Sequence, residues 1–146
     1  MADNSNTRQQ AEAFINALHA LEEDGGDGEA ALDQITDLYA DDATLTNSAL
    51  KLVGEDRQGK EAVHAFWKEY KKTFGKAYSD FHHIAAGDDS AGLFWVTKGT
   101  APGGEEGGVA YDGSTLLVFN SEGKISHFQG YYDTQQLSRA MGVEKA

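Results

Sequence analysis

The side chains in this sequence that could carry chemistry are carboxylates, histidines, tyrosines and amides, because the chain contains no cysteine. Thiolate nucleophiles, disulfides and cysteine-based metal sites are therefore excluded. His82 and His83 are candidates for proton exchange near neutral pH. They are adjacent in a segment predicted to be a strand, so they point to opposite faces and cannot hold one metal ion together. We expect one of them to face the interior, and we expect no metal site.

Asp133 is a third candidate for an acid or base. It stands at the end of a predicted strand and precedes Thr-Gln-Gln, so its carboxylate could equally cap the helix that begins there. Gln136 occupies the position that would complete a capping box. Asn47 also has two interpretations: a turn residue that hydrogen-bonds to its own backbone, or a polar contact for a ligand in a pocket.

Composition bounds the size and charge of the protein. A chain of 146 residues with 40% hydrophobic content is sufficient for one core, so we expect a single domain over residues 1–146. Asp and Glu outnumber Lys and Arg by 24 to 12, which gives a formal net charge of −12. A surface of this sign repels phosphate backbones and anionic lipids, so neither nucleic acid nor membrane is an expected partner. The acidity fits ordinary solubility and also fits adaptation to high salt.

The sequence contains no apolar run long enough to cross a bilayer, and no hydrophobic segment follows the polar N-terminal residues. We therefore expect a soluble, cytoplasmic protein. Nothing in the sequence indicates a nucleotide site, and no cofactor is expected.

The elements that must position these residues are three helices followed by a four-stranded antiparallel meander. Helices are predicted where apolar residues recur every three or four positions, and strands where β-branched and aromatic residues are concentrated. The predicted order is helices over residues 7–23, 29–39 and 60–74, strands over 78–86 and 92–100, a β-hairpin over 109–133, and a last helical turn or two over 134–141.

Both faces of the predicted sheet are apolar. Trp95 and Leu117 lie on one face, and Phe94, Leu116 and Val118 lie on the other. The three helices can cover only one face. We therefore predict a homodimer that pairs the outer sheet faces, with a monomer that exposes this face as the alternative.

Three segments carry a resemblance to a known family. They read Leu-Tyr-Ala-Asp-Asp-Ala-Thr-Leu at 38–45, Gly-Lys-Glu-Ala-Val at 59–63 and Gly-Lys-Ile at 123–125. Together with the order of elements, they resemble the nuclear transport factor 2-like superfamily, in its SnoaL-like and ketosteroid-isomerase-like branch, over roughly residues 12–137. The resemblance implies an α+β fold, a cone-shaped barrel in which three N-terminal helices are packed on a strongly bent, four- to six-stranded antiparallel sheet around a pocket.

The catalytic set of the steroid isomerases is missing from the matching positions. These enzymes place a carboxylate base where Asn47 stands here, and an amide cannot accept that proton. The Tyr and protonated Asp of their oxyanion hole correspond to Phe14 and Thr115, of which only Thr115 could donate a hydrogen bond. Steroid isomerisation is therefore not expected.

Limonene-type epoxide hydrolases of the superfamily use two Asp and one Arg with a Tyr and an Asn. The charged positions correspond to Gly99, Thr97 and Gly130, and the Tyr position to Leu45, so that Asn47 is the sole match. Epoxide hydrolysis is not expected either.

SnoaL-like polyketide cyclases use an acid or base, usually an Asp with a His nearby, and Asp133 is a possible counterpart for that Asp. The resemblance thus implies a pocket for a small hydrophobic or aromatic molecule, with or without a proton-transfer step of the cyclase, isomerase or lyase type. The other interpretation is a non-catalytic binding or dimerisation module of the same fold. The residues predicted to form the pocket are Phe14, Leu18, Asn47, Val63, Trp67, Trp95, Thr97, Thr115, Leu117, Phe128 and Tyr132.

Overall fold

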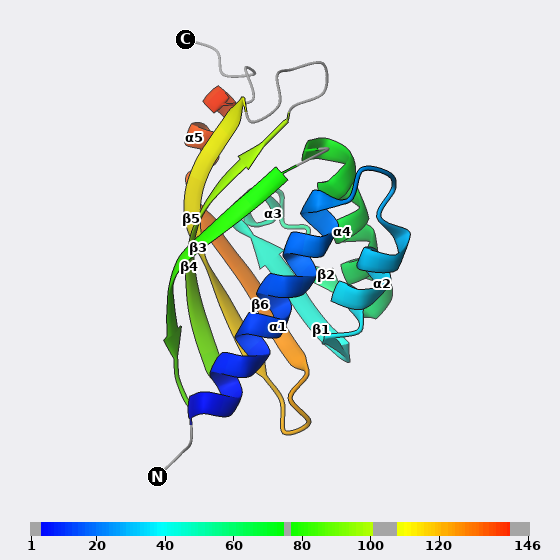
Figure 1. The fold of residues 1–146 in the computed structure, drawn as a ribbon, viewed down its shortest axis with the longest axis vertical. Helices are drawn as coiled ribbons and strands as arrows, with labels where there is room; N and C mark the ends of the chain where they lie inside the picture. Colours follow the sequence, from blue (N-terminus) through cyan, green and yellow to red (C-terminus); the bar gives the residue numbers. More distant parts are fainter. Residues whose placement is uncertain (1–3, 75–76, 101–107, 141–146) are drawn as a thin grey trace.

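The computed structural model describes residues 4–74, 77–100 and 108–140 (Figure 1). Within these residues there are five helices and six strands. The helices are α1 (Asn4–Glu23), α2 (Glu29–Thr36), α3 (Ser48–Val53), α4 (Lys60–Phe74) and α5 (Thr134–Ala140). The strands are β1 (Tyr39–Asn47), β2 (Arg57–Gln58), β3 (Ala77–Ala86), β4 (Ser90–Gly99), β5 (Val109–Phe119) and β6 (Ile125–Tyr132).

The six strands form one curled sheet in the order β2-β1-β6-β5-β4-β3. The predicted α+β fold is confirmed, with three differences of detail. The chain adds the short helix α3 between β1 and β2. The sheet is open, because β2 and β3 form its two edges. It is also not antiparallel throughout, since β1 and β6 run parallel. Most of the chain separates these two strands, so no hairpin turn fixes their relative direction.

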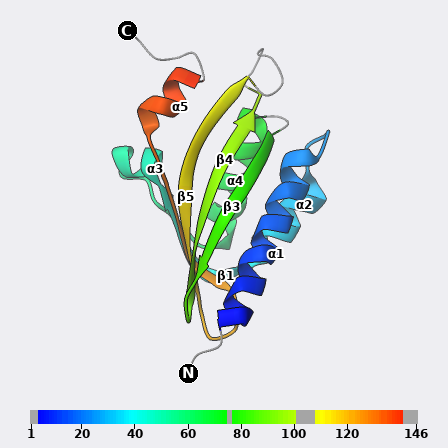
Figure 2. The same cartoon turned by 60° about the vertical axis from the view of Figure 1, so that its left-hand side comes forward.

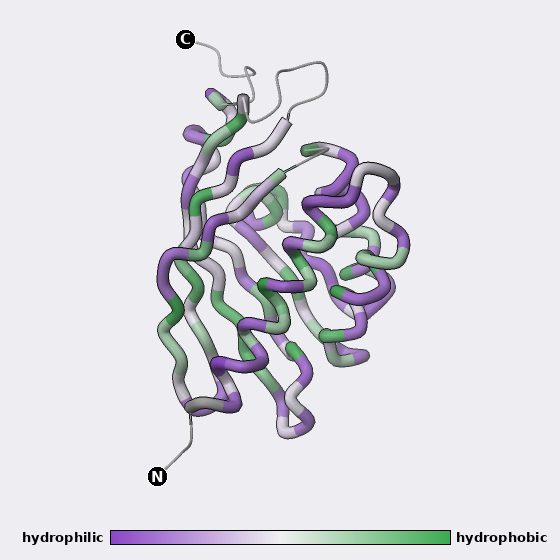
Figure 3. The backbone as a smooth tube through the Cα atoms, in the orientation of Figure 1, coloured by the Kyte–Doolittle hydropathy of each residue, from purple (hydrophilic) through white to green (hydrophobic). Residues whose placement is uncertain are grey.

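The helices α1, α2 and α4 lie together on one face of the sheet (Figures 1 and 2). On α1, the apolar stripe that includes Ala11, Phe14 and Leu18 is buried, as its spacing predicts. It packs against β3 and β4, while α4 packs against β1. Hydrophobic and hydrophilic residues consequently alternate along α1 and along the strands (Figure 3).

The strands β4 and β5 have a buried inner face and a partly exposed outer face, as their alternation predicts. Trp95 and Leu117 are buried on the inner face. Leu116 and Val118 are half-buried on the outer face, and Phe94 there is 39% exposed. The outer surface of the described sheet therefore combines polar groups with exposed apolar ones.

A β-bulge interrupts β3. Phe81 pairs with Trp95 and His83 pairs with the preceding residue, Phe94, so His82 is an extra residue without an opposite partner. The bulge changes the alternation of the strand, which places Phe81 and Ile84 toward the core.

Within the described residues, no helix combines the length and the apolar character that crossing a bilayer requires.

Candidate ligand-binding pocket

A cavity of about 300 Å³ lies between α1, α4 and the inner face of the sheet. The helices α3 and α5 contribute Leu50 and Leu137 to its wall. Because β1 and β6 are parallel neighbours, their C-terminal ends lie side by side. Each strand is followed by one of these two short helices, β1 by α3 and β6 by α5. The parallel pairing thus brings both helices to the cavity.

Ten aromatic side chains line the cavity. They are Phe14, Phe66, Trp67, Tyr70, Phe74, Phe81, Trp95, Tyr111, Phe128 and Tyr132. Their rings contact one another: the Tyr111 centroid lies 5.4 Å from that of Trp95 and 5.5 Å from that of Tyr132. Gly113 leaves room for the Trp95 ring, since a Cβ atom at this glycine would lie 2.9 Å from it. Such a surface favours an apolar or aromatic guest.

Nine of the eleven residues predicted for the pocket line this cavity. They are Phe14, Leu18, Asn47, Trp67, Trp95, Thr97, Thr115, Phe128 and Tyr132. Val63 and Leu117 are not part of its wall, because they are fully buried in the core cluster beside it. Strand and helix periodicity places both on the correct face, but it does not show how far along that face the cavity extends.

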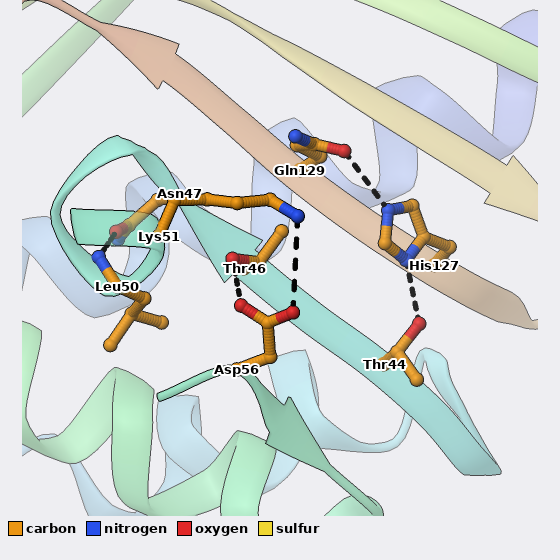
Figure 4. A network of polar contacts seen from close by, with 8 residues as sticks. All are labelled: Thr44, Thr46, Asn47, Leu50, Lys51, Asp56, His127 and Gln129. Carbon is orange, nitrogen blue, oxygen red and sulfur yellow. Dashed lines mark hydrogen bonds and ion pairs between the residues drawn. The ribbon is translucent and has the colours of Figure 1, made fainter. Parts of the chain in front are cut away.

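Asn47 hydrogen-bonds to the backbone of its own segment, as one of the two interpretations predicts. Its Oδ1 accepts a hydrogen bond of 2.8 Å from the backbone N–H of Leu50, so it is the N-cap of α3 (Figure 4). The residue also lines the cavity.

Asp133 caps α5 instead of lining the cavity. Its Oδ1 accepts hydrogen bonds from the backbone N–H groups of Gln135, at 2.8 Å, and Gln136, at 3.4 Å, and the residue is exposed. The Gln136 side chain accepts from the backbone N–H of Asp112. The N-cap prediction for Asp133 is therefore confirmed.

The expectation that His82 or His83 faces the interior is wrong. Both side chains are exposed, and neither lines the cavity. The His83 ring lies against Phe94 on the outer face, with 5.7 Å between their centroids. The cause is the bulge, which shifts the alternation of β3 so that two successive histidines point away from the core.

A buried carboxylate, that of Glu22, lies beside the cavity and is not among the residues predicted from the sequence. Only 1% of this residue is exposed. Its Oε1 accepts from the backbone N–H of Ser79 at 2.9 Å, and its Oε2 accepts from the Ser79 and Tyr70 hydroxyls, each at 2.6 Å. The Ser79 hydroxyl lies 2.7 Å from that of Thr97. Ser79, Tyr70 and Thr97 all line the cavity, so the carboxylate lies directly behind its polar end.

Lys71 is a second buried charge. Lys68 and Lys72 on the same helix are exposed, yet Lys71 is buried. Its ammonium donates to the backbone carbonyls of Glu22 and Asp24 at the C-terminal end of α1. Both buried charges continue apolar stripes, since Glu22 is four residues after Leu18 and Lys71 four residues after Trp67. This spacing is the signal that could have predicted them.

Burial keeps the phenols of the pocket protonated. It is the main cause that raises the pKa of Tyr70, and the negative charge of Glu22 raises this pKa further. Burial also raises the pKa values of Tyr111 and Tyr132. At neutral pH these hydroxyls therefore act through hydrogen bonds, not through charge.

A separate polar cluster lies where β1, β6 and the segment after α3 meet (Figure 4). The Thr44 hydroxyl lies 2.6 Å from Nδ1 of His127, whose Nε2 lies 3.3 Å from Oε1 of Gln129. Next to this chain, the Thr46 hydroxyl donates to Asp56 at 2.5 Å. In the part of the chain that the structure describes, no group of three His, Asp or Glu side chains is arranged to hold a metal ion.

The family follows from a comparison with protein-family models. The model described as a SnoaL-like domain matches residues 11–128. The chain belongs to this family. The resemblance predicted from the three sequence segments is therefore confirmed for this SnoaL-like protein.

Solved structures similar to the SnoaL-like chain share its fold at low sequence identity. An NTF2-like protein of unknown function from Burkholderia pseudomallei is 16% identical, with a TM-score of 0.76 over 94% of this chain and 98% of that one. A protein with a ketosteroid isomerase-like fold from Catenulispora acidiphila, in complex with trimethylamine, is 18% identical, with a TM-score of 0.74 over 93% of this chain and 94% of that one. An LEH-like epoxide hydrolase from M. tuberculosis is 14% identical, with a TM-score of 0.68 over 94% of this chain and 90% of that one. Comparison with curated proteins gave no match.

Proposed function

We propose that this SnoaL-like protein binds a small hydrophobic or aromatic molecule in its aromatic pocket. The observation that supports the proposal is the cavity of about 300 Å³ with ten aromatic side chains in its wall. Pockets of this size, mostly apolar with a few polar groups, are typical of small-molecule sites. Binding in such a pocket requires only shape and a few hydrogen bonds.

A proton-transfer activity of the cyclase, isomerase or lyase type is the second candidate. The acids and bases suggested by the sequence, Asp133, His82 and His83, are exposed and do not line the cavity. The observation that supports catalysis is Glu22, whose carboxylate is joined to the cavity through the hydroxyl of Tyr70. Binding without turnover requires fewer groups and is the function we favour.

Filling the cavity tests the proposal. Naphthalene should bind the wild-type protein at one molecule per chain in isothermal titration calorimetry. The Thr73→Trp variant places an indole in the cavity from α4, since Thr73 lines it, and should weaken binding about tenfold or more by removing the space for the guest. Lys72→Trp, at an exposed position next to it, is the matched control and should bind like the wild type.

The absence of saturable naphthalene binding by the wild type would contradict the proposal, as would equal affinity in the Thr73→Trp variant. Native mass spectrometry of the protein as purified, before and after denaturation, would give the mass of any retained ligand.

We also propose a cytoplasmic location. A chain without cysteine forms no disulfide and needs no oxidising compartment to fold.

A further inference from the structure

The hydrogen bonds of Glu22 fix the direction of the hydroxyl protons at the polar end of the pocket. An ionised carboxylate only accepts hydrogen bonds. Both carboxylate oxygens of Glu22 are acceptors here, since Oε1 accepts from the backbone N–H of Ser79 and Oε2 lies 2.6 Å from the Tyr70 and Ser79 hydroxyls. Tyr70 and Ser79 must therefore both donate their hydroxyl protons to Glu22.

The direction of the Thr97 hydroxyl proton is fixed as well. Because the hydroxyl proton of Ser79 points at Glu22, Ser79 can only accept in its 2.7 Å contact with Thr97, and Thr97 must be the donor. The hydroxyl protons of Tyr70 and Thr97 are thus both used inside the protein. What these two residues can still offer a guest is the acceptor lone pairs of their oxygens.

Tyr111 adds a donor at the same place. Its ring lies in the wall of the cavity, and its hydroxyl makes no hydrogen bond to another residue that the structure describes. Tyr111 on β5 pairs directly with Thr97 on β4, so the two side chains lie next to each other on the same face of the sheet. At the polar end, the oxygens of Tyr70 and Thr97 can therefore only accept hydrogen bonds from a guest, and the Tyr111 hydroxyl can donate one.

We infer that the pocket selects molecules that carry a hydroxyl group, an alcohol or a phenol, on an apolar skeleton. The hydroxyl would donate to the oxygen of Tyr70 or Thr97 and accept from Tyr111. A carbonyl or ether oxygen in the same place could accept from Tyr111, but it has no proton to donate and would face the lone pairs of Tyr70 and Thr97. This is the opposite polarity to an oxyanion hole, which presents donors to a developing negative charge. The inference rests on the proposed function, because it names the class of ligand for the same cavity.

Three probes of one skeleton test the inference by isothermal titration calorimetry on the full chain: naphthalene, 2-naphthol and 2-methoxynaphthalene. The methoxy compound retains the oxygen but lacks the proton to donate. We expect 2-naphthol to bind about tenfold more tightly than 2-methoxynaphthalene, the effect of one or two buried hydrogen bonds.

The decisive variant is Glu22→Gln. The side-chain amide keeps the shape of Glu22 and can still accept from the Ser79 backbone, but its N–H₂ group donates to the Tyr70 and Ser79 hydroxyls. Their protons, and through Ser79 that of Thr97, are then released toward the cavity. The tenfold preference for 2-naphthol over 2-methoxynaphthalene should fall to about one, because both probes can accept. The control is Glu23→Gln, the same change at the next, exposed position of α1, which should retain the preference.

Tyr70→Phe is a second variant that tests the same inference if Glu22→Gln does not fold. This variant removes one acceptor and leaves both Ser79 contacts of Glu22 in place, so it should lower the preference for 2-naphthol over 2-methoxynaphthalene. Equal affinities of the wild type for the three probes, or an unchanged preference in Tyr70→Phe, would overturn the inference alone. A failure of all three probes to bind would overturn the proposed function and the inference with it.

Discussion

Four tyrosines, Tyr39, Tyr70, Tyr111 and Tyr132, have pKa values raised above the ordinary value, mainly by removal of the phenol from water. In the unfolded chain a tyrosine loses its proton near pH 10. Between about pH 10 and the higher pKa of the folded state, the unfolded chain therefore holds fewer protons than the folded one. The contribution of these phenols to stability is complete below about pH 10 and is lost as the pH rises above it.

We therefore predict that the melting temperature falls steeply above about pH 10. Absorbance at 295 nm, which reports phenolate, should show that Tyr39, Tyr70 and Tyr111 ionise only when the protein unfolds. Tyr39→Phe should make the decline with pH shallower, because it removes one of the four groups. Ionisation of all six tyrosines in a protein that retains its native circular dichroism would contradict this prediction.

At the scale of single residues, the sequence predicted nine of the residues that line the cavity but not the buried charge behind them. Phe14, Trp67 and Trp95 lie on regular apolar stripes, and periodicity is sufficient to predict which way they face. Glu22 lies on the same stripe as Phe14, but a carboxylate in that position is stable only because Ser79 and Tyr70 donate to it. Those partners come from segments about fifty residues later, and no local pattern predicts that they meet.

At the scale of elements, the close approach of β5 to its neighbours depends on Gly113. This residue pairs with Trp95 on β4 and with Tyr132 on β6. A Cβ atom here would lie 2.2 Å from the backbone oxygen of Tyr131 and 2.9 Å from the Trp95 ring. Strand backbone cannot move aside as a flexible side chain can.

We predict that Gly113→Ala lowers the free energy of unfolding by roughly 3 kcal/mol, because the added methyl group overpacks the sheet. It should also weaken naphthalene binding, since the Trp95 ring must move. Gly92→Ala on β4 is the control: its nearest contact would be 3.7 Å from Phe94, and it should change stability by less than about 1 kcal/mol. Urea denaturation followed by circular dichroism measures both. Equal stability of the two variants would refute the packing argument.

The elements themselves show where sequence patterns stop being informative. The spacing of apolar residues along the chain predicts the buried stripes of α1 and α4 and the buried faces of β4 and β5. The structure agrees with these predictions. The bulge at His82 has no sequence signal of its own, because a bulge is defined by the pairing of two strands and not by the residues of one strand. The parallel pairing of β1 with β6 joins segments about eighty residues apart, and only the complete sheet determines it.

At the scale of the whole molecule, the outer sheet face is the surface most suited to a second copy of the chain. His83, Phe94, Ser114 and Tyr131 form a row across four strands. Phe94 and Tyr131 in this row are 39% and 47% exposed. Exposed apolar groups on a sheet face often mark an interface, and a two-fold dimer would bring this row against its own copy.

We propose a homodimer through this face and predict that Phe94→Glu or Tyr131→Glu shifts the protein to a monomer in light scattering coupled to size-exclusion chromatography. Each variant would bury a charge without a partner at the interface. Leu52→Glu is the control, because Leu52 is a highly exposed apolar residue that belongs to helix α3 and not to the sheet. A wild-type protein that is monomeric at high concentration would contradict the proposal.

The tryptophan fluorescence of this protein should report directly on its cavity. The chain contains two tryptophans, and both Trp67 and Trp95 line the cavity. All of the indole emission of the protein therefore arises beside the guest, and no distant tryptophan adds a constant background. A compound that enters the cavity should shift or quench the entire signal, so the unlabelled protein can serve as its own optical sensor in a search for its natural ligand.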